Sequence, residues 1–150
     1  LHFEPMVSDS LVLVMTPGLH ERYGHLPTEE LLRSLPWVMR EEGSGTRMAM
    51  AASLAGFSID VNSLRTVMMV RNAGAMARCL SAGMGAAITS AITVAPELRS
   101  GQLVSVDLPG LQMKRSFYVV FNTRRSLFPA ALKLIEYLKN NAENQVRTQS

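Results

Sequence analysis

Short apolar runs that favour β-strands alternate with helix-forming stretches along the chain, and this alternation constrains the fold more than any other feature. One unbroken apolar run, Leu11-Val12-Leu13-Val14-Met15, is typical of a strand that is buried on both faces. Strands that alternate with helices indicate an α/β fold with a mostly parallel sheet and helices on both of its faces. The expected strands are 11–15, 37–40, 65–70, 86–89, 103–108 and 116–122.

Helix-forming segments fill the intervals between these runs. Thr28 is a good N-cap residue followed by two glutamates, and the helix that it opens must end before Pro36. The segment from Thr46 to Leu54 is rich in Met, Ala and Leu, which favour helix. Further helices are expected over 75–81, 91–94 and 127–141, with Ser126 as the cap of the last one and a frayed polar tail over 143–150.

The composition excludes several classes of protein. With 47% apolar residues the chain can bury a core, so intrinsic disorder is not expected. The single cysteine, Cys79, allows neither an internal disulfide nor a zinc site built from cysteines, and we expect no metal and no cofactor. A cytoplasmic setting fits best, although a cysteine-poor secreted protein would look the same. No signal peptide opens the chain, and its longest uncharged stretch, 79–96, is too polar to cross a membrane.

The net charge of +3 is unevenly distributed. Residues 1–46 hold three arginines and seven acidic residues, so the rest of the chain carries a surplus of basic side chains. This surplus is either a solvated surface without further meaning or a field that attracts anions. No basic cluster is dense enough to indicate direct contact with DNA.

The most informative stretch runs from Arg40 to Arg47 and joins an expected strand to an expected helix. Gly43 and Gly45 let the backbone turn sharply and approach a ligand closely. The first amides of a helix have no partner within the helix, and together with the helix dipole they form a site for a carboxylate, sulfate or phosphate. The hydroxyls of Ser44 and Thr46 add donors. A capped helix without any ligand is an equally simple interpretation, and the stretch is not a P-loop because no lysine follows the second glycine.

A second strand-to-helix junction follows at 70–75. Asn72 is suited to cap its helix, with Ala73 next to it. In a parallel sheet both junctions lie at the carboxyl ends of strands, which is where open α/β sheets bind ligands, so the two junctions frame one pocket. Arg71 is either a counter-ion for a bound anion or, more simply, an exposed arginine.

No combination of residues indicates catalysis, and we expect no catalytic residue. The three histidines lie near the start of the chain without a nucleophile in a recognisable frame, and Ser44 lies in Gly-Ser-Gly, not in the Gly-x-Ser-x-Gly of hydrolases. Cys79 lies among small residues of an expected helix, as a packed thiol does. Gly83-Met84-Gly85 follows a helix and does not open one, so we interpret it as a helix stop before a strand.

Taken in order, these segments resemble the C-terminal effector-binding domain of the LysR-type transcriptional regulators. The resemblance covers nearly the whole chain, and it rests on the series of segments because no single motif is diagnostic. The matching segments are Leu11-Val12-Leu13-Val14 with Pro17 and His20, Leu26 to Leu31, Pro36-Trp37-Val38, Glu41 to Arg47, Ala82 to Ala87, Ala95 to Leu98 with Gly101-Gln102-Leu103, and Arg115 to Val120.

The resemblance implies a periplasmic-binding-protein-like fold in which a small effector, here expected to be an anion, binds between two subdomains. The effector changes how a homodimer or homotetramer sits on promoter DNA, which is bound by an N-terminal helix-turn-helix that is absent from this chain. Ser90 stands where the family commonly has proline. The implied effector contacts are Gly43, Ser44, Gly45, Thr46, Asn72, Ala73, Thr89 and Ser90.

The resemblance also implies a division of the chain. Residues 1–14 are the end of subdomain one and the start of the crossover, 15–115 are a complete subdomain two, and 116–150 are the returning strand and last helix of subdomain one. Subdomain one is therefore partial, and because Leu1 is not an initiator methionine we expect an excised piece of a longer protein. An extracytoplasmic solute-binding protein of the same fold is the alternative function, and an enzyme on this fold is a third. The DNA upstream distinguishes the first two, because it encodes either a helix-turn-helix or a secretory signal.

Overall fold

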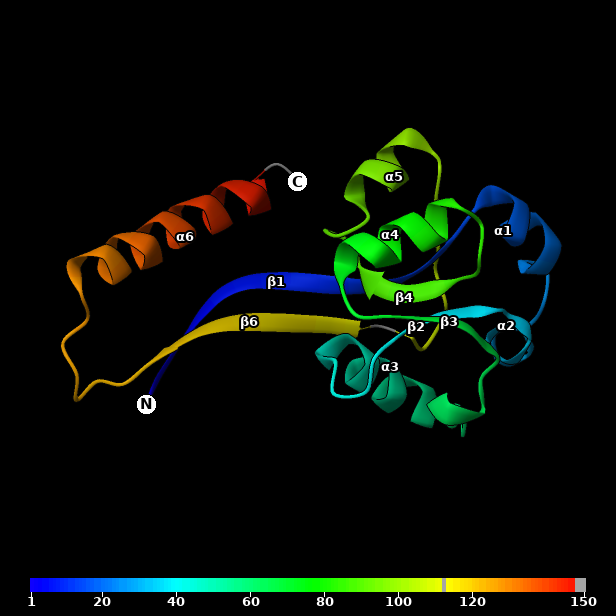
Figure 1. The fold of residues 1–150 in the computed structure, drawn as a ribbon, viewed down its shortest axis with the longest axis horizontal. Coiled ribbons are helices and arrows are strands. Elements are labelled where there is room, and N and C mark those ends of the chain that lie inside the picture. Colours follow the sequence, from blue (N-terminus) through cyan, green and yellow to red (C-terminus); the bar gives the residue numbers. More distant parts are fainter. Residues whose placement is uncertain (112, 148–150) are drawn as a thin grey trace. The chain divides into compact units, whose positions relative to one another are not determined.

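The computed structural model describes residues 1–111 and 113–147, and its strands and helices follow one another as the sequence alternation requires (Figure 1). The strands are β1 (His2–Met15), β2 (Trp37–Arg40), β3 (Thr66–Val70), β4 (Ala87–Ser90), β5 (Val104–Val106) and β6 (Met113–Phe121). The helices are α1 (Pro17–Tyr23), α2 (Thr28–Ser34), α3 (Gly45–Ala55), α4 (Ala73–Ser81), α5 (Ala95–Ser100) and α6 (Pro129–Arg147), with a 3₁₀ turn η1 (Val61–Ser63).

The chain forms two compact units. The first consists of residues 1–9 and 115–150, and the second of residues 10–114. Both β1 and β6 begin in one unit and end in the other, and the two strands pair with each other. The division within β1 falls between Asp9 and Ser10, inside the segment 1–14 that the resemblance gives as the end of subdomain one and the start of the crossover. That these units are the two subdomains of the resemblance stays a prediction.

The sheet of the second unit is mixed, so the expectation of a mostly parallel sheet was wrong. β1 pairs antiparallel with β4, from Leu11 opposite Ser90 to Val14 opposite Ala87, and antiparallel with β5 on its other side. β2 pairs in parallel with β3, and a parallel bridge between Trp37 and Ala86 joins β2 to β4. The apolar run in β1 did indicate burial, but burial on both faces is possible for a strand of either direction.

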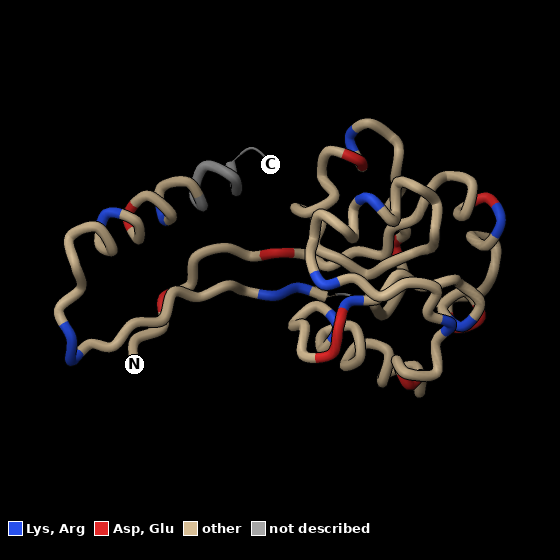
Figure 2. The backbone as a smooth tube through the Cα atoms, viewed as in Figure 1, with Lys and Arg blue, Asp and Glu red and all other residues tan. Residues whose placement is uncertain are grey.

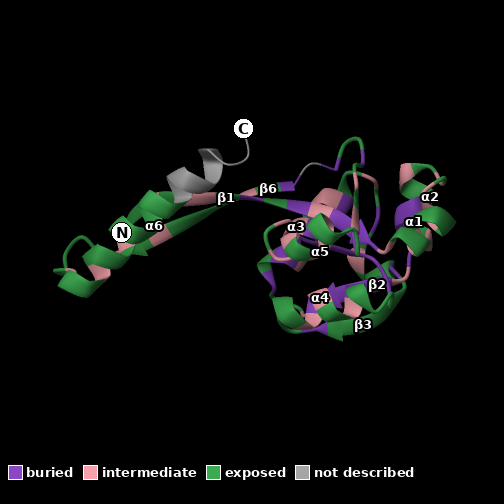
Figure 3. Ribbon diagram, turned by 90° about the horizontal axis from the view of Figure 1, so that it is seen from above, coloured by how far each residue is buried: buried purple, intermediate pink, exposed green. Residues whose placement is uncertain are grey.

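Helices cover both faces of this sheet, as expected. Because side chains alternate along a strand, Leu13 of β1 packs in one core cluster with α2 and α3, whereas Val14 packs in another with α4. Figure 1 shows α3 and α4 on opposite sides of the strands, and Figure 3 shows the buried residues concentrated in the sheet and on the inner faces of the helices. The buried Trp37 fixes α2 to β2, since its indole N–H donates to the Leu32 carbonyl at 2.9 Å.

Several helix boundaries differ from the expected ones. α1 was not indicated by the sequence; Thr16 caps it by accepting the Leu19 N–H. Pro27, and not Thr28, occupies the N-cap position of α2. The helix expected over 91–94 is a turn, and α5 begins after it at Ala95 with a proline in its first turn, where the missing N–H of proline costs no hydrogen bond.

The last helix also differs from its prediction. α6 begins at Pro129, where the Phe128 carbonyl accepts from the amides of Ala131 and Leu132, so Ser126 lies too early to be its N-cap. It continues to Arg147, so the part of the expected frayed tail over 143–147 is helical, and 148–150 lie outside the described residues.

The first unit holds α6 by a salt bridge between Lys139 and Glu4 of β1. Arg115 of β6 pairs with the buried carboxylate of Asp9 at 2.9 Å. Of the apolar stripe predicted for the last helix, Leu134 and Leu138 are exposed. The apolar stripe of α6 is therefore only partly covered by the described residues.

Gly83 and Gly85 end α4 and allow β2 and β4 to approach, which confirms the helix stop. Gly83 has a φ of +72°, a conformation that glycine adopts without strain, and the next amide, that of Met84, donates back to the Cys79 carbonyl. A Cβ atom on Gly85 would lie 2.5 Å from the Pro36 carbonyl oxygen, which is closer than van der Waals contact permits.

We therefore expect Gly85→Ala to destabilise the protein by about 1–3 kcal/mol, because the backbone at Pro36, directly before β2, must shift to admit the methyl group. The matched control is Gly18→Ala in α1, where no heavy atom lies within 4 Å of the added Cβ. Chemical denaturation of both variants measures the difference. Equal stability of the two variants would contradict the close approach at Gly85.

Candidate effector site

Three strands of the second unit end at the same edge of the sheet. Arg40 and Val70 are register partners in the parallel pair β2–β3, and β4 runs in the same direction as β2 through the bridge at Trp37 and Ala86. The Glu41 N–H donates to the Val70 carbonyl at 3.2 Å, which ties the first two junctions together. All eight expected contact residues lie in the segments that end or follow these three strands, so the fold brings them to one edge.

The first junction is a tight turn closed by Ser44. Gly43 has a φ of +84°, so this turn requires glycine at that position. The buried Ser44 is the N-cap of α3: its hydroxyl accepts the Arg47 N–H at 3.4 Å, and its own N–H donates to the Glu41 carbonyl at 3.2 Å. The Ser44 amide thus has a partner within the turn, and contact of Ser44 with an effector stays a prediction.

Gly45 differs from Gly43 in what it contributes. It is the first residue of α3, it is exposed, its φ is not positive, and no heavy atom lies within 4 Å of a Cβ built on it. The turn therefore does not need glycine here for its conformation, contrary to the prediction. The adjacent Thr46, in contrast, is buried and engaged with the protein.

The second junction has the cap that the sequence predicted. The Asn72 side-chain oxygen accepts the Ala75 N–H at 2.8 Å, and Ala73 is the first residue of α4. Asn72, Ala73 and Gly74 are all exposed. The N-terminus of α4 therefore opens to the surface at the edge where α3 also begins.

The third junction follows β4 and is more enclosed. Thr89 and Ser90 are both buried, opposite Val12 and Leu11 of β1. The Ser90 hydroxyl accepts the Ile92 N–H at 3.2 Å, and the Ala91 N–H donates to the Ser10 carbonyl. A serine at this position thus orders the turn that leads into α5 through its side chain.

Charged residues of both signs lie in the first two junctions (Figure 2). The Arg40 guanidinium forms two hydrogen bonds to the Glu41 carboxylate, at 2.8 and 3.0 Å. These bonds, with a smaller electrostatic contribution from Arg71, lower the pKa of Glu41 from 4.5 to about 2, and the bonds to Glu41 raise the pKa of Arg40. Three arginines (Arg40, Arg47 and Arg71) and two glutamates (Glu41 and Glu42) lie in these two junctions, so the edge has a balance of one positive charge.

Two cavities lie away from this edge. One of about 250 Å³ runs beside β1 and β5 in the second unit, and one of about 320 Å³ lies beneath α6 in the first unit. None of the eight expected contact residues lines either cavity. Among residues 1–111 and 113–147, no three His, Cys, Asp or Glu side chains form a group that could hold a metal ion, and no helix there is long and apolar enough to cross a membrane.

The family model described as the LysR substrate binding domain matches residues 1–143. The chain belongs to this family. A RuBisCO operon transcriptional regulator from Allochromatium vinosum is 31% identical over 135 residues, which are 89% of this chain and 44% of that protein. The LysR domain described here therefore spans less than half the length of this curated relative.

Solved effector domains confirm the periplasmic-binding-protein-like α/β fold. The Synechocystis PCC6803 CcmR regulatory domain, in complex with 2-PG, superposes with a TM-score of 0.79 at 24% identity, over 95% of this chain and 67% of that one. The effector binding domain of QuiR, in complex with shikimate, gives 0.73 at 16% identity, over 95% and 66% of the two chains.

Sequence reasoning missed two residues of this LysR domain that hold the first junction in place. The Arg47 guanidinium donates to the Arg40 carbonyl at 3.0 Å and to the Asn62 side-chain oxygen at 2.9 Å. Arg47 was noticed only as part of the Gly-Ser-Gly-Thr-Arg stretch, and no pattern in the sequence connects it to Asn62.

We expect the Glu41 carboxyl to titrate with a pKa of about 2 in the protein and to move up toward 4.5 in Arg40→Met. Because the folded-state pKa lies below the ordinary value, the pair stabilises the fold above pH 4.5, and this contribution is lost as the pH falls toward 2. Carbon-13 NMR of the side-chain carboxyl measures both values. Arg71→Met is the control and should raise the pKa less; a titration unchanged by Arg40→Met would rule out this pair as the cause.

Proposed function

We propose that this LysR domain senses a small anion at the edge where β2, β3 and β4 end. The observation that carries the proposal is the convergence of two helix N-termini, those of α3 and α4, on one exposed edge that has a positive charge balance. A helix of eleven residues such as α3 directs a partial positive charge at its first turn, where a carboxylate, sulfate or phosphate is stabilised.

The backbone, more than the side chains, is the recognition element in this proposal. Ser44 and Asn72 cap their own helices, so their side chains already have partners. The exposed Gly45 carries its N–H at the first helical position, where no partner within the helix exists. Arg71, exposed at the end of β3, adds a positive charge to the same edge.

The role of the whole protein follows from the curated relatives and is part of the proposal. The relative from Allochromatium vinosum is named as a transcriptional regulator, and its chain is more than twice as long as the portion matched here. We take this chain to be a non-enzymatic sensor domain whose effector changes the arrangement of a homodimer or homotetramer on promoter DNA in the cytoplasm. An N-terminal helix-turn-helix would make the contacts with DNA.

The sharpest test removes one amide hydrogen without removing the helix. In Gly45→Pro the first helical position loses its N–H, and proline is tolerated there because Ser44 already has an extended backbone, with φ −64° and ψ 129°. We expect sulfate and inorganic phosphate to bind roughly 10- to 100-fold more weakly, the size expected for one lost hydrogen bond to a charged group. Titration calorimetry measures the affinities, and thermal denaturation checks that the fold is retained.

Gly45→Ala is the matched control because it keeps the N–H and adds a methyl group where no atom lies within 4 Å. It should fold normally and retain more affinity than the proline variant. Equal affinity of the wild-type protein and Gly45→Pro for both anions would exclude the Gly45 amide from the site.

A further inference from the structure

Arg47 braces the turn that leads from β2 into α3. One guanidinium nitrogen donates to the carbonyl of Arg40, the last residue of β2, at 3.0 Å, and the other donates to the side chain of Asn62 in η1 at 2.9 Å. The Arg47 amide meanwhile donates to Ser44. The Arg47 side chain therefore links the two ends of the segment 40–47 to each other and to η1.

The segment that receives this brace is itself firmly held. The Asn62 N–H donates to the Asp60 carboxylate at 2.9 Å, and the Ser63 hydroxyl donates to the Asp60 carbonyl at 2.6 Å. Ile59 and Leu64, on either side of this turn, are buried in the core of the second unit. These contacts hold Asn62 in position independently of Arg47. The hydrogen bond between Asn62 and Arg47 therefore fixes the start of α3 relative to η1.

The charge of Arg47 points to a role beyond stability. Arg47 is the third residue of α3, a position where glutamate or glutamine would complete a capping box with Ser44. A cation in the first turn opposes the helix dipole and costs stability. Both side-chain acceptors of Arg47 are neutral, a carbonyl and an amide, so these contacts do not neutralise its charge. The arrangement adds positive potential at the helix end where an anion is proposed to bind.

We infer that Arg47, held by Asn62, is a positioning residue for anion recognition. It fixes the first amides of α3 relative to the carboxyl end of β2 and keeps a positive charge beside them, without itself contacting the effector. This inference rests on the proposed function of the same edge. It names two side chains, 15 residues apart in the sequence, as determinants of affinity.

Two variants test the brace separately from the charge. Asn62→Ala removes the acceptor and leaves the Arg47 charge in place, whereas Arg47→Lys keeps the charge but cannot hold both acceptors in the planar geometry of a guanidinium. We expect each variant to bind sulfate and inorganic phosphate roughly tenfold more weakly, and the double variant to lose little more, because both changes break one interaction. The readouts are titration calorimetry and the nitrogen-15 NMR shift of the Gly45 amide without ligand, which should move in both variants.

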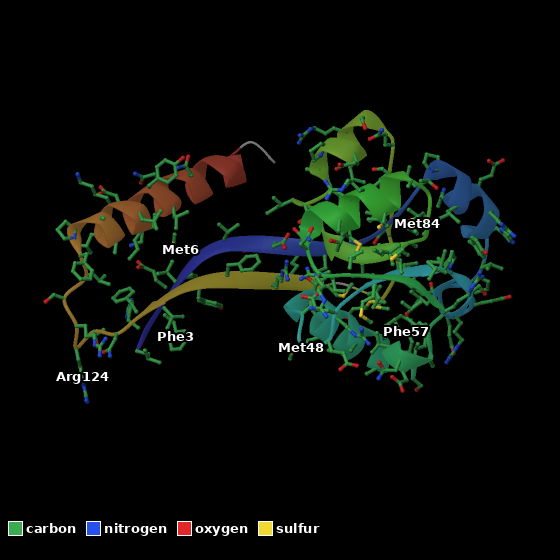
Figure 4. The ribbon with its side chains drawn as sticks, viewed as in Figure 1. Phe3, Met6, Met48, Phe57, Met84 and Arg124 are labelled. Carbon is green, nitrogen blue, oxygen red and sulfur yellow. The ribbon has the colours of Figure 1, made fainter. Side chains whose placement is uncertain are left out.

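Met48→Ala is the control, since Met48 is the next residue of α3 and is 64% exposed (Figure 4). It should change neither the affinity nor the Gly45 shift. Wild-type affinity in Asn62→Ala, with binding still weakened by Gly45→Pro, would overturn the positioning role and leave the proposed function intact. A wild-type protein that binds neither anion would overturn both.

Discussion

The parallel alignment of β2 with β3, extended by the bridge to β4, is the constraint on which the candidate site depends. Parallel strands place their carboxyl ends at one edge, and the chain must leave each of them through a turn. With helices packed on both faces of the sheet, two of those turns lead directly into helices, so the N-termini of α3 and α4 arrive together at that edge. Topology thus brings the positive ends of two helix dipoles to this edge before any charged side chain is considered.

Side chains that looked like ligand contacts turn out to organise the turns. Ser44 and Asn72 each accept an amide of their own helix, and Ser90 accepts the amide of Ile92. A capping side chain satisfies a backbone donor that would otherwise face the solvent, and it fixes the direction in which the remaining amides point. A serine or asparagine at the start of a helix can either contact a ligand directly or fix the turn that positions the backbone amides. The sequence alone does not distinguish these two roles.

Membership of the LysR substrate binding domain family accounts for the architecture but leaves the effector to this chain's own residues. The solved effector domains share the fold at 24% and 16% identity, and the ligands in those complexes belong to those proteins. In this chain, the Arg40 guanidinium donates two hydrogen bonds to the Glu41 carboxylate. The Arg47 guanidinium donates instead to two neutral oxygens, the Arg40 carbonyl and the Asn62 side-chain amide. The charge of Arg40 is therefore paired with a carboxylate, whereas these two acceptors of the Arg47 guanidinium carry no charge.

The sequence by itself determined the α/β class, the order of the strands along the chain and the cap at Asn72, because apolar alternation and capping are local properties. It did not determine the direction of β1, since a strand buried on both faces looks the same whether its neighbours are parallel or antiparallel. The sequence predicted the same sharp turn for Gly43 and Gly45, although of these two only Gly43 has a positive φ. It did not predict the hydrogen bond between Arg47 and Asn62. Strand direction, backbone strain and contacts between distant side chains depend on which segments meet in space, and tertiary structure alone decides that.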